Sequence, residues 1–408
     1  MNTFTFLLEN RRFLAFGLAC TLASNFGQTF FIALFGDHIR ADYNLSHGEF
    51  AGLYGGATLV SAAIILWAGR QIDKVDLRYF ASTVLIGLAL SCAILAIAPG
   101  PWIIALGFVG LRLFGQGLLR HTAMVSMARY FEAARGRAMS FVGLGYPIAE
   151  SIFPTALVIL LSSFTWQQTW AGFAVYIALL HLPLLLWLLK GHGVRHAKLE
   201  QYLKDTKEDT VPLSQRDLLK DWRFQTIVPA ALMGPFIMTG VFFHQLAIAS
   251  SKGWTIELLA ASFPVFAAST VITSLITGWM VDRKGPGYIL PVFVLPLAFA
   301  LIVIAVFDQT WSAPLYHGLG GLSVGASTVL ISAAWAETYG VRYLGVIRSL
   351  TTSLTVVSTA LAPVLAGELL DMGTSISSIA WGGSVIVLLT ALLVQAPART
   401  LRTNSKHN

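Results

Sequence analysis

Residues 69–74 read Gly-Arg-Gln-Ile-Asp-Lys, and residues 278–283 read Gly-Trp-Met-Val-Asp-Arg. Both stretches place an aspartate four residues after a glycine and a basic residue directly after the aspartate, and the two copies lie 209 residues apart. A second pair of stretches, residues 132–137 and 337–342, begins with glutamate, ends with arginine and is offset by 205 residues. The chain therefore contains a repeat, and its two halves are expected to share one architecture.

The composition around these repeats excludes an ordinary soluble protein. Of 408 residues, 56% are hydrophobic and only 12% are charged, about half the usual share, and the mean hydropathy is +0.70. The same composition excludes a disordered protein, a small disulfide-rich protein and a nucleic-acid-binding protein. Cys20 and Cys92 lie inside apolar runs, and the sequence has neither a Gly-x-x-x-x-Gly-Lys-Ser/Thr loop nor a His/Cys cluster with metal spacing. We therefore expect a protein that is not an enzyme or an ATP-driven pump, with no cofactor and no metal site.

Twelve apolar runs are long enough to cross a bilayer, and only helices satisfy the backbone polar groups of such runs in lipid. The predicted fold is an all-α polytopic membrane protein with twelve transmembrane helices in two six-helix bundles. The bundles cover residues 1–190 and 223–408, and a polar cytoplasmic linker at 191–222 joins them. The expected spans are 13–36, 49–69, 79–98, 102–126, 138–162, 169–189, 224–249, 257–281, 288–307, 313–335, 346–369 and 377–396.

Basic residues are concentrated in alternate loops, which predicts the orientation of the spans. The opposite loops hold only Arg40 and Lys252. The basic loops carry Arg70, Lys74, Arg78, Arg129, Arg135, Arg137, Arg283, Lys284 and Arg342, together with the linker and the tail. Both termini are expected in the cytoplasm, with the chain crossing the plasma membrane (the inner membrane) of a bacterium. The net charge of +7 then reflects topology rather than affinity for an acidic partner.

The repeated loops and the fourth span carry a resemblance to a known family. With Gly-x-x-x-Asp-Arg/Lys after the second and eighth spans and Arg112-Leu-Phe-Gly115-Gln-Gly117 on the fourth, the chain resembles the major facilitator superfamily over essentially its whole length. Asp76 stands where a second glycine is common in that motif, so the turn departs from the family pattern. The resemblance implies a secondary transporter that works by alternating access through rocking of two halves.

Three stretches resemble bacterial monocarboxylate and oxalate–formate transporters: GQGLLRHTAMVSMARYF (115–131), RGRAMSFVGLGYPIAE (135–150) and AETYGVRYLGVIRSL (336–350). This resemblance implies that the cargo is a small organic anion, such as a monocarboxylate moved with a proton. The basic residue usual on the eighth span of that group is missing, because residues 257–281 contain none. An anionic site would therefore be built on the fourth span.

The charged residues of the paired loops are candidates for a cytoplasmic gate. A carboxylate near the N-terminus of another helix meets the positive end of that helix's dipole. Asp73 is expected to reach the start of the eleventh span in this way, and Asp282 the start of the fifth. The predicted gate comprises Gly69, Asp73, Lys74, Arg78, Arg137, Asp282, Arg283 and Arg342. The alternative is that these charges only mark cytoplasmic loops.

Polar side chains in the middle of the spans are candidates for the transport site, because ionisable groups are costly at that depth. Arg112 lies about ten residues into the fourth span, and Gln116 and Arg120 share its helix face. Arg112 needs an anionic partner, either a fixed carboxylate or the substrate. The other candidate substrate-binding residues are Asn25, Gln28, His244 and Gln245.

Glu150 is the candidate proton-coupling residue. It lies at similar depth on the fifth span, one turn after Pro147. Burial and a neighbouring arginine act on such a carboxyl in opposite directions, so its proton occupancy can change with conformation. The alternative is a permanent structural pair between Arg112 and Glu150. His121, on the opposite side of the fourth span from Arg112, is either a second proton carrier or a contact between helices.

The sequence therefore predicts a secondary transporter that moves a small organic anion together with a proton, as a monomer in the lipid bilayer and without nucleic acid. The alternative is a proton-driven exporter of drugs or other amphipathic compounds, whose cavity would be wider and more aromatic, and the 26 phenylalanines leave this alternative open. A membrane-bound receptor or structural protein is a third possibility from another class, which the duplicated loops disfavour.

Overall fold

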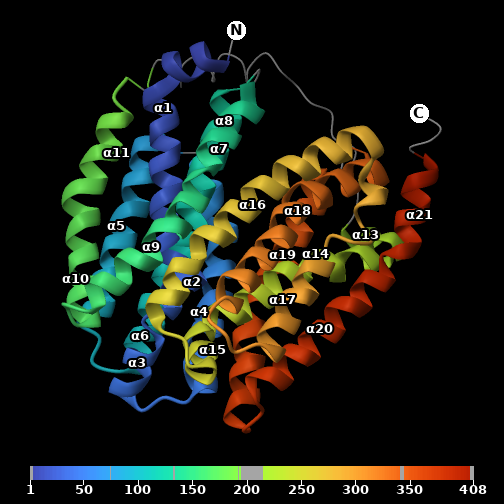
Figure 1. The fold of residues 1–408 in the computed structure, drawn as a ribbon. Helices are drawn as coiled ribbons and strands as arrows, with labels where there is room; N and C mark the ends of the chain where they lie inside the picture. The colour runs from blue at the N-terminus through green and yellow to red at the C-terminus, as the bar shows by residue number, and fades with distance from the viewer. Residues whose placement is uncertain are drawn as a thin grey trace. The chain divides into compact units, whose positions relative to one another are not determined.

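The structure, a computed structural model, describes residues 3–73, 75–131, 134–191, 193, 215–340 and 344–404. Every regular element in these ranges is a helix (Figure 1). The chain forms two compact units. Unit 1 comprises Met1–Tyr43, Gly56–Phe153 and Ile159–Val211, and unit 2 comprises Asn44–Gly55, Pro154–Val158 and Pro212–Asn408.

Within the described residues, ten helices are long and apolar enough to cross a membrane. They are His47–Ile72, Leu77–Ala96, Pro101–Tyr130, Gly136–Leu161, Trp166–Leu188, Trp222–Phe243, Ile256–Lys284, Ser312–Tyr339, Leu350–Asp371 and Ile376–Arg402. At most half of the most apolar stretch of each helix is buried, so the remaining apolar side chains face outward, as lipid-facing side chains do. The predicted all-α polytopic membrane fold is thereby confirmed.

The first and ninth expected spans are not continuous helices. The first is interrupted by a short 3-10 helix at Ser24–Gly27 and by extended backbone at Gln28. In the ninth, only Leu295–Val306 forms a regular α-helix. Pro286, Pro291 and Pro296 lie at or before its start, and each lacks the N–H that a preceding helical turn would need. The runs of apolar residues predicted the positions of these two spans. They did not predict that the helices would be interrupted.

Unit 1 is built from helices of the first half of the chain. Its helix α1 packs on α7 and α8, and α5 packs on α6 and α10. The elements are α1 (Thr3–Ala23), η1 (Ser24–Gly27), α2 (Thr29–Ala33), α3 (Gly36–Tyr43), η2 (Gly69–Asp73), α5 (Leu77–Ala96), α6 (Pro101–Gly110), η3 (Leu111–Leu119), α7 (Arg120–Tyr130), α8 (Arg135–Gly143), α10 (Trp166–Tyr176), η5 (Ile177–His181) and α11 (Leu182–Leu188), with parts of α4 (His47–Ala68) and α9 (Gly145–Leu161).

Unit 2 is built mainly from the second half. Its helix α16 packs along α18, α14 along α19, and α17 against both α18 and α20. The elements are α13 (Gln215–Lys220), α14 (Trp222–Phe243), α15 (Gln245–Lys252), α16 (Ile256–Lys284), η6 (Pro286–Tyr288), α17 (Leu295–Val306), α18 (Ser312–Tyr339), α19 (Leu344–Asp371), α20 (Ile376–Leu393) and α21 (Gln395–Asn404).

Two helices of the first half contribute to both units. Residues 44–55, which include the first turns of α4, and residues 154–158 of α9 group with unit 2, while the rest of each helix belongs to unit 1. The predicted division at the 191–222 linker assigned each helix to one bundle only. Most of that linker lies outside the described residues.

Candidate functional site

The interrupted first span and the fourth span approach each other closely inside unit 1. A Cβ atom on Gly27 would lie 2.2 Å from the carbonyl oxygen of Leu111 and 2.5 Å from the amide nitrogen of Gln116. A Cβ on Gly115 would in turn lie 2.9 Å from the amide nitrogen of Gly27. Only glycine lets two backbones come this near. The Gly27–Gly115 contact therefore fixes where the two spans cross.

The break in the first span makes one backbone carbonyl available. In a regular helix the amide of Phe31 would bond to the carbonyl of Gly27. Here the amide of Phe31 instead donates at 3.2 Å to the carbonyl of Gln28, which also accepts the regular helical bond from the amide of Ile32 at 3.1 Å. The Gly27 carbonyl accepts a hydrogen bond from Nη1 of Arg112 at 3.2 Å. The interruption thus creates an acceptor for the buried arginine.

Arg112 is only 3% exposed. It lies in a π-helical stretch, Leu111–Leu119, within the fourth span, and such wide turns are frequent at functional sites. Gln116 follows on the same stretch, and its Nε2 donates to Oε1 of Gln28 at 3.2 Å. The structure thus brings together three of the predicted substrate-binding side chains, those of Arg112, Gln116 and Gln28. We call these three side chains and Gly27 the Arg112 cluster.

Asn25 lies in the same interruption of the first span and is completely buried. Its Nδ2 donates to the carbonyl of Thr21 at 2.9 Å, a bond within its own helix. Its Oδ1 has no hydrogen-bond partner among the described residues. An amide oxygen accepts but does not donate, so this atom suits a protonated group better than an anion.

Glu150 lies on α9, and Arg120 is a charged residue that acts on its carboxyl group. Arg120 lies one helical turn C-terminal to Gln116, and its guanidinium is placed over the ring of Tyr146, 4.9 Å from the ring centroid. Tyr146 precedes Glu150 by one turn of α9. The structure thus groups Glu150 with Arg120 and Tyr146.

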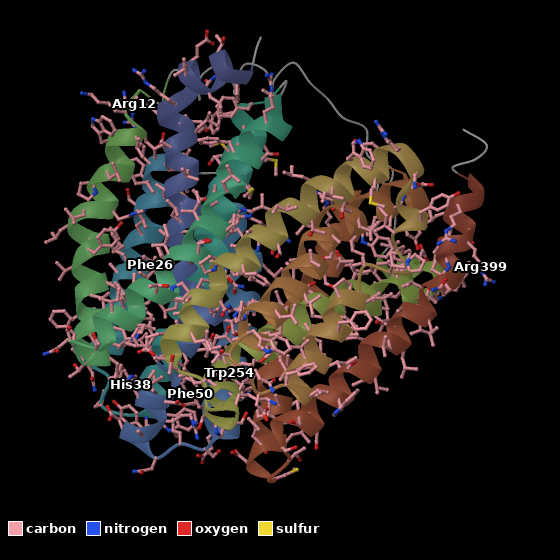
Figure 2. All side chains as sticks on the ribbon, viewed as in Figure 1. Arg12, Phe26, His38, Phe50, Trp254 and Arg399 are labelled. Atoms are coloured by element: carbon pink, nitrogen blue, oxygen red, sulfur yellow. The ribbon has the colours of Figure 1, made fainter. Side chains whose placement is uncertain are left out.

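An aromatic cluster packs beside the break. Phe26, labelled in Figure 2, has its ring centroid 5.0 Å from that of Phe173, 5.3 Å from Phe153 and 5.5 Å from Phe31. Phe26 and Phe31 are 5% and 1% exposed. These rings fill space and hold the interrupted span in position.

The 69–78 loop is held by side chains of the fourth span. His121 Nε2 lies 3.0 Å from the carbonyl oxygen of Gly69, and Arg129 donates to the carbonyl of Ile72 at 3.1 Å. Asp76 accepts a bond from the amide of Arg78 at 2.8 Å and so caps α5, although it replaces the usual glycine. The contact of His121 with a backbone carbonyl favours the second of its two predicted roles, a contact between helices.

The remaining predicted gate residues lie at the ends of helices. Arg78 donates to the carbonyl of Leu189 at 3.1 Å, and the guanidinium of Arg137 lies 5.0 Å from the ring centroid of Phe6. Arg283 lies 4.3 Å from the ring centroid of Trp279, and Asp282 is exposed near the end of α16. Lys74, Arg342 and the side chain of Asp73 lie outside the described residues.

The other two predicted substrate-binding residues, His244 and Gln245, lie in unit 2, where α14 ends and α15 begins. His244 is 5% exposed, and its Nε2 lies 2.8 Å from the carbonyl oxygen of Pro363 on α19. Its ring centroid is 5.9 Å from that of His47. Gln245 is completely buried. These contacts connect α14 to α19 and to the first turn of α4.

The start of α4 is bound by a carboxylate that the sequence analysis did not single out. Asp371, the last residue of α19, accepts hydrogen bonds from the amides of His47 at 3.0 Å and Gly48 at 2.7 Å. A Cβ on Gly367 would lie 2.8 Å from the carbonyl oxygen of His47. A negative charge at the C-terminus of a helix is unfavourable because that end of the helix dipole is also negative. This is the sequence signal that could have indicated that Asp371 binds the start of another helix. One turn further along α4, Phe50, labelled in Figure 2, stacks on Phe243 with ring centroids 5.2 Å apart.

The long apolar helices of both units make this chain a polytopic helical membrane protein, and in the described ranges no group of three or more His, Cys, Asp or Glu side chains is placed to hold a metal. The sequence matches the Major Facilitator Superfamily over residues 17–363, and the chain belongs to that family. It is a multi-pass membrane transporter that takes a small-molecule substrate, and not an enzyme.

Solved structures agree with this fold. A bacterial homolog of the human lysosomal transporter Spinster, in an inward-facing and occupied conformation, is similar with a TM-score of 0.70 and 15% identity, covering 96% of this chain and 97% of that chain. The inward-facing and unoccupied form of such a homolog has a TM-score of 0.65 and 14% identity, covering 96% and 98%. No curated protein matches the sequence. At these identities the similarity shows the fold alone.

Proposed function

We propose that this secondary transporter moves a small organic anion, such as a monocarboxylate, and that Arg112 binds the anion. The observation that carries the proposal is the buried guanidinium that donates to the carbonyl of Gly27 at 3.2 Å. A backbone carbonyl is a neutral acceptor, whereas a carboxylate forms charge-assisted and often bidentate bonds with a guanidinium, roughly twice as strong. A substrate carboxylate would therefore replace the Gly27 carbonyl as acceptor.

This exchange of acceptors would link binding to the shape of the first span. The Gly27 carbonyl belongs to a backbone break, and Gln28 beside it is already bonded to Gln116. Releasing Arg112 from Gly27 would leave the break without one of the contacts that hold it. The binding energy would then bias the conformation of the first span, as alternating access requires.

We further propose that Glu150 carries a coupled proton. Its charged neighbour, Arg120, already rests over the ring of Tyr146. When Glu150 is protonated, Arg120 keeps this cation–π contact and is not left without a stabilising neighbour. When Glu150 is ionised, the same guanidinium is close enough to act on the carboxylate. Both protonation states are thus accommodated by one arrangement.

The test is ligand-dependent thermal stabilisation of the purified chain. A ligand that binds only the folded state stabilises it by about 2.7 kcal/mol when its free concentration is about 100 times its Kd. We expect acetate, lactate or oxalate to stabilise the unmodified protein and to have no effect on Arg112→Gln. Arg112→Lys should restore little, because lysine lacks the planar fork of the guanidinium.

Arg12→Gln is the matched control for this test. Arg12, labelled in Figure 2, also donates to a backbone carbonyl, that of Trp187, but it is exposed to solvent. Its removal should leave carboxylate binding unchanged. Equal stabilisation of Arg112→Gln and the unmodified protein would overturn the anion site.

Export of amphipathic compounds remains the second candidate. The observation in its favour is the aromatic cluster around Phe26, which lies directly beside the break that carries Gly27. Its rings are buried against one another, so they would have to separate before they could stack on a ligand. Stabilisation by lipophilic cations, with none by small carboxylates, would favour export.

The remaining proposals concern the protein in the cell. We propose a monomer in a bacterial inner membrane, with protons as the coupling ion and both termini in the cytoplasm. The asymmetric distribution of arginine and lysine between alternate loops supports this orientation. The cytoplasmic gate formed by Asp73, Asp282 and the start of the fifth and eleventh spans is part of the same proposal.

A further inference from the structure

A cavity of about 410 Å³ lies entirely within unit 2, among α14, α17, α19 and α20. We call it the α19–α20 pocket. Almost all of its lining is aliphatic or aromatic carbon, and the polar side chains that reach it are His244, Thr374 and Ser378. None of the residues of the Arg112 cluster belongs to it. The pocket is therefore separate from the proposed anion site.

Small residues on three of the four helices line the pocket. Gly240 on α14, Ala362 and Ala366 on α19, and Gly382 and Gly383 on α20 all line it. A Cβ on Gly382 would meet no atom within 4 Å, and one on Gly240 would meet nothing closer than 3.7 Å. The pocket is open at the surface of unit 2 rather than enclosed. The medium that surrounds these helices can therefore enter it.

Water is a poor occupant of this pocket. A buried water needs two to four polar partners, and apolar cavities stay dry. His244 already has its Nε2 engaged with the carbonyl of Pro363. Thr374 and Ser378 lie together at one end only, where α19 turns into α20. The chemistry of the lining therefore selects an apolar occupant with, at most, a polar group at that end.

The wall of the pocket is continuous with the outward-facing surface of two membrane-spanning helices. Ile386 on α20 and Leu365 on α19 line the pocket and are 50% and 52% exposed. Val385 and Leu389 continue the exposed apolar face of α20 outside the pocket. A face of this kind on a membrane span is covered by lipid chains. An acyl chain needs only to pass between α19 and α20 to enter.

We propose that the α19–α20 pocket binds one acyl chain of a bilayer phospholipid. The chain lies against the glycine and alanine positions of α14, α19 and α20, and the headgroup stays at the end marked by Thr374 and Ser378. The bound chain supports α19, the helix that holds His244 through Pro363 and the start of α4 through Asp371. The lipid therefore acts as a structural ligand of unit 2.

The proposal is tested with the full chain in vesicles of phosphatidylcholine that contain an increasing fraction of phosphatidylcholine with a photoreactive diazirine on one acyl chain. Cross-linked residues are identified by peptide mass spectrometry. We expect labelling of pocket residues to saturate at a low fraction of the probe, while labelling around the exposed Leu389 rises in proportion to it. Pocket labelling that is absent, or that rises in proportion like that at Leu389, overturns the proposal.

A variant that fills the pocket provides the second arm. Gly382→Phe places a ring where no atom lies within 4 Å of the Cβ position, and it should lower pocket labelling several-fold. Val385→Phe, on the same helix but outside the lining, is the matched control and should leave pocket labelling unchanged. If Gly382→Phe folds and is labelled in the pocket like the unmodified chain, the proposal is wrong. If it does not fold, the saturation measurement on the unmodified chain still decides.

Discussion

Replacing Asp371 by asparagine should weaken the contact between the end of α19 and the start of α4. Both carboxylate oxygens are used, one on the amide of His47 at 3.0 Å and one on the amide of Gly48 at 2.7 Å. Asparagine keeps one acceptor oxygen and turns an N–H₂ donor toward the other amide, which is itself a donor. Asp371 and residues 44–55 both belong to unit 2. We expect this contact to open transiently, and Asp371→Asn to make the open form more populated.

The magnitude follows from the chemistry of helix N-termini. Losing a side chain that caps a helix costs about 0.5–2 kcal/mol. Asp371 is largely exposed, so screening by water lowers the contribution of its charge, and one of its two bonds survives in asparagine. An estimate of about 1 kcal/mol follows, which corresponds to a shift of about fivefold in the equilibrium between the closed and open forms of the contact.

The assay is alkylation of a cysteine placed on the covered face of α4. Ala51 is completely buried, and so are the native Cys20 and Cys92. A maleimide should therefore react with Ala51→Cys only when the contact opens. We expect the reaction of the purified protein to be about fivefold faster when Asp371→Asn is added, because the open form is about fivefold more populated.

Asp308→Asn is the control for this assay. It removes another exposed acidic group, the partner of Lys252 at 2.6 Å, without touching α4. Its alkylation rate should equal that of Ala51→Cys alone. If Asp371→Asn reacts no faster than this control, the assignment of Asp371 as the anchor of α4 is refuted.

Four further outcomes are expected. Gly27→Ala places a Cβ 2.2 Å from a backbone oxygen and should lower the thermal unfolding temperature through overpacking of about 1–3 kcal/mol, whereas Gly52→Ala, whose Cβ meets nothing within 4 Å, should not. Asp73→Asn should slow transport at unchanged expression if the cytoplasmic gate exists, and a normal uptake rate would count against it. Glu150→Gln should retain substrate exchange but lose uptake driven by a pH gradient, while loss of folding would indicate a structural role. Hydrogen bonds from the guanidinium of Arg223 lower the pKa of Asp221 in the folded protein. The carboxylate therefore stabilises the fold above its unfolded pKa, and this stabilisation is lost as the pH falls through the lower folded pKa. Asp221→Asn should remove this loss of stability at acid pH, measured as the free energy of unfolding against pH.

The candidate site could be predicted only in part. Helical periodicity placed Arg112 and Gln116 on one face, and the structure brings both to the first span, where Gln28 was also expected. The periodicity did not reveal that a backbone carbonyl, that of Gly27, would be the acceptor. Nor did it indicate that Glu150 would face Arg120, because two arginines on one helix face are equivalent until the neighbouring helix is placed.

Membrane helices are specified locally, and this is why the sequence alone determined ten of the twelve spans, the repeat and the superfamily. Each apolar run must bond its own backbone in lipid, whatever its neighbours are. The contacts that define the site join residues far apart in the chain, 85 residues for Arg112 and Gly27 and 323 for Asp371 and Gly48. They depend on how closely glycines allow two backbones to approach and on which helix lies opposite. Only the tertiary structure decides both, because the same apolar pattern is compatible with many helix pairings.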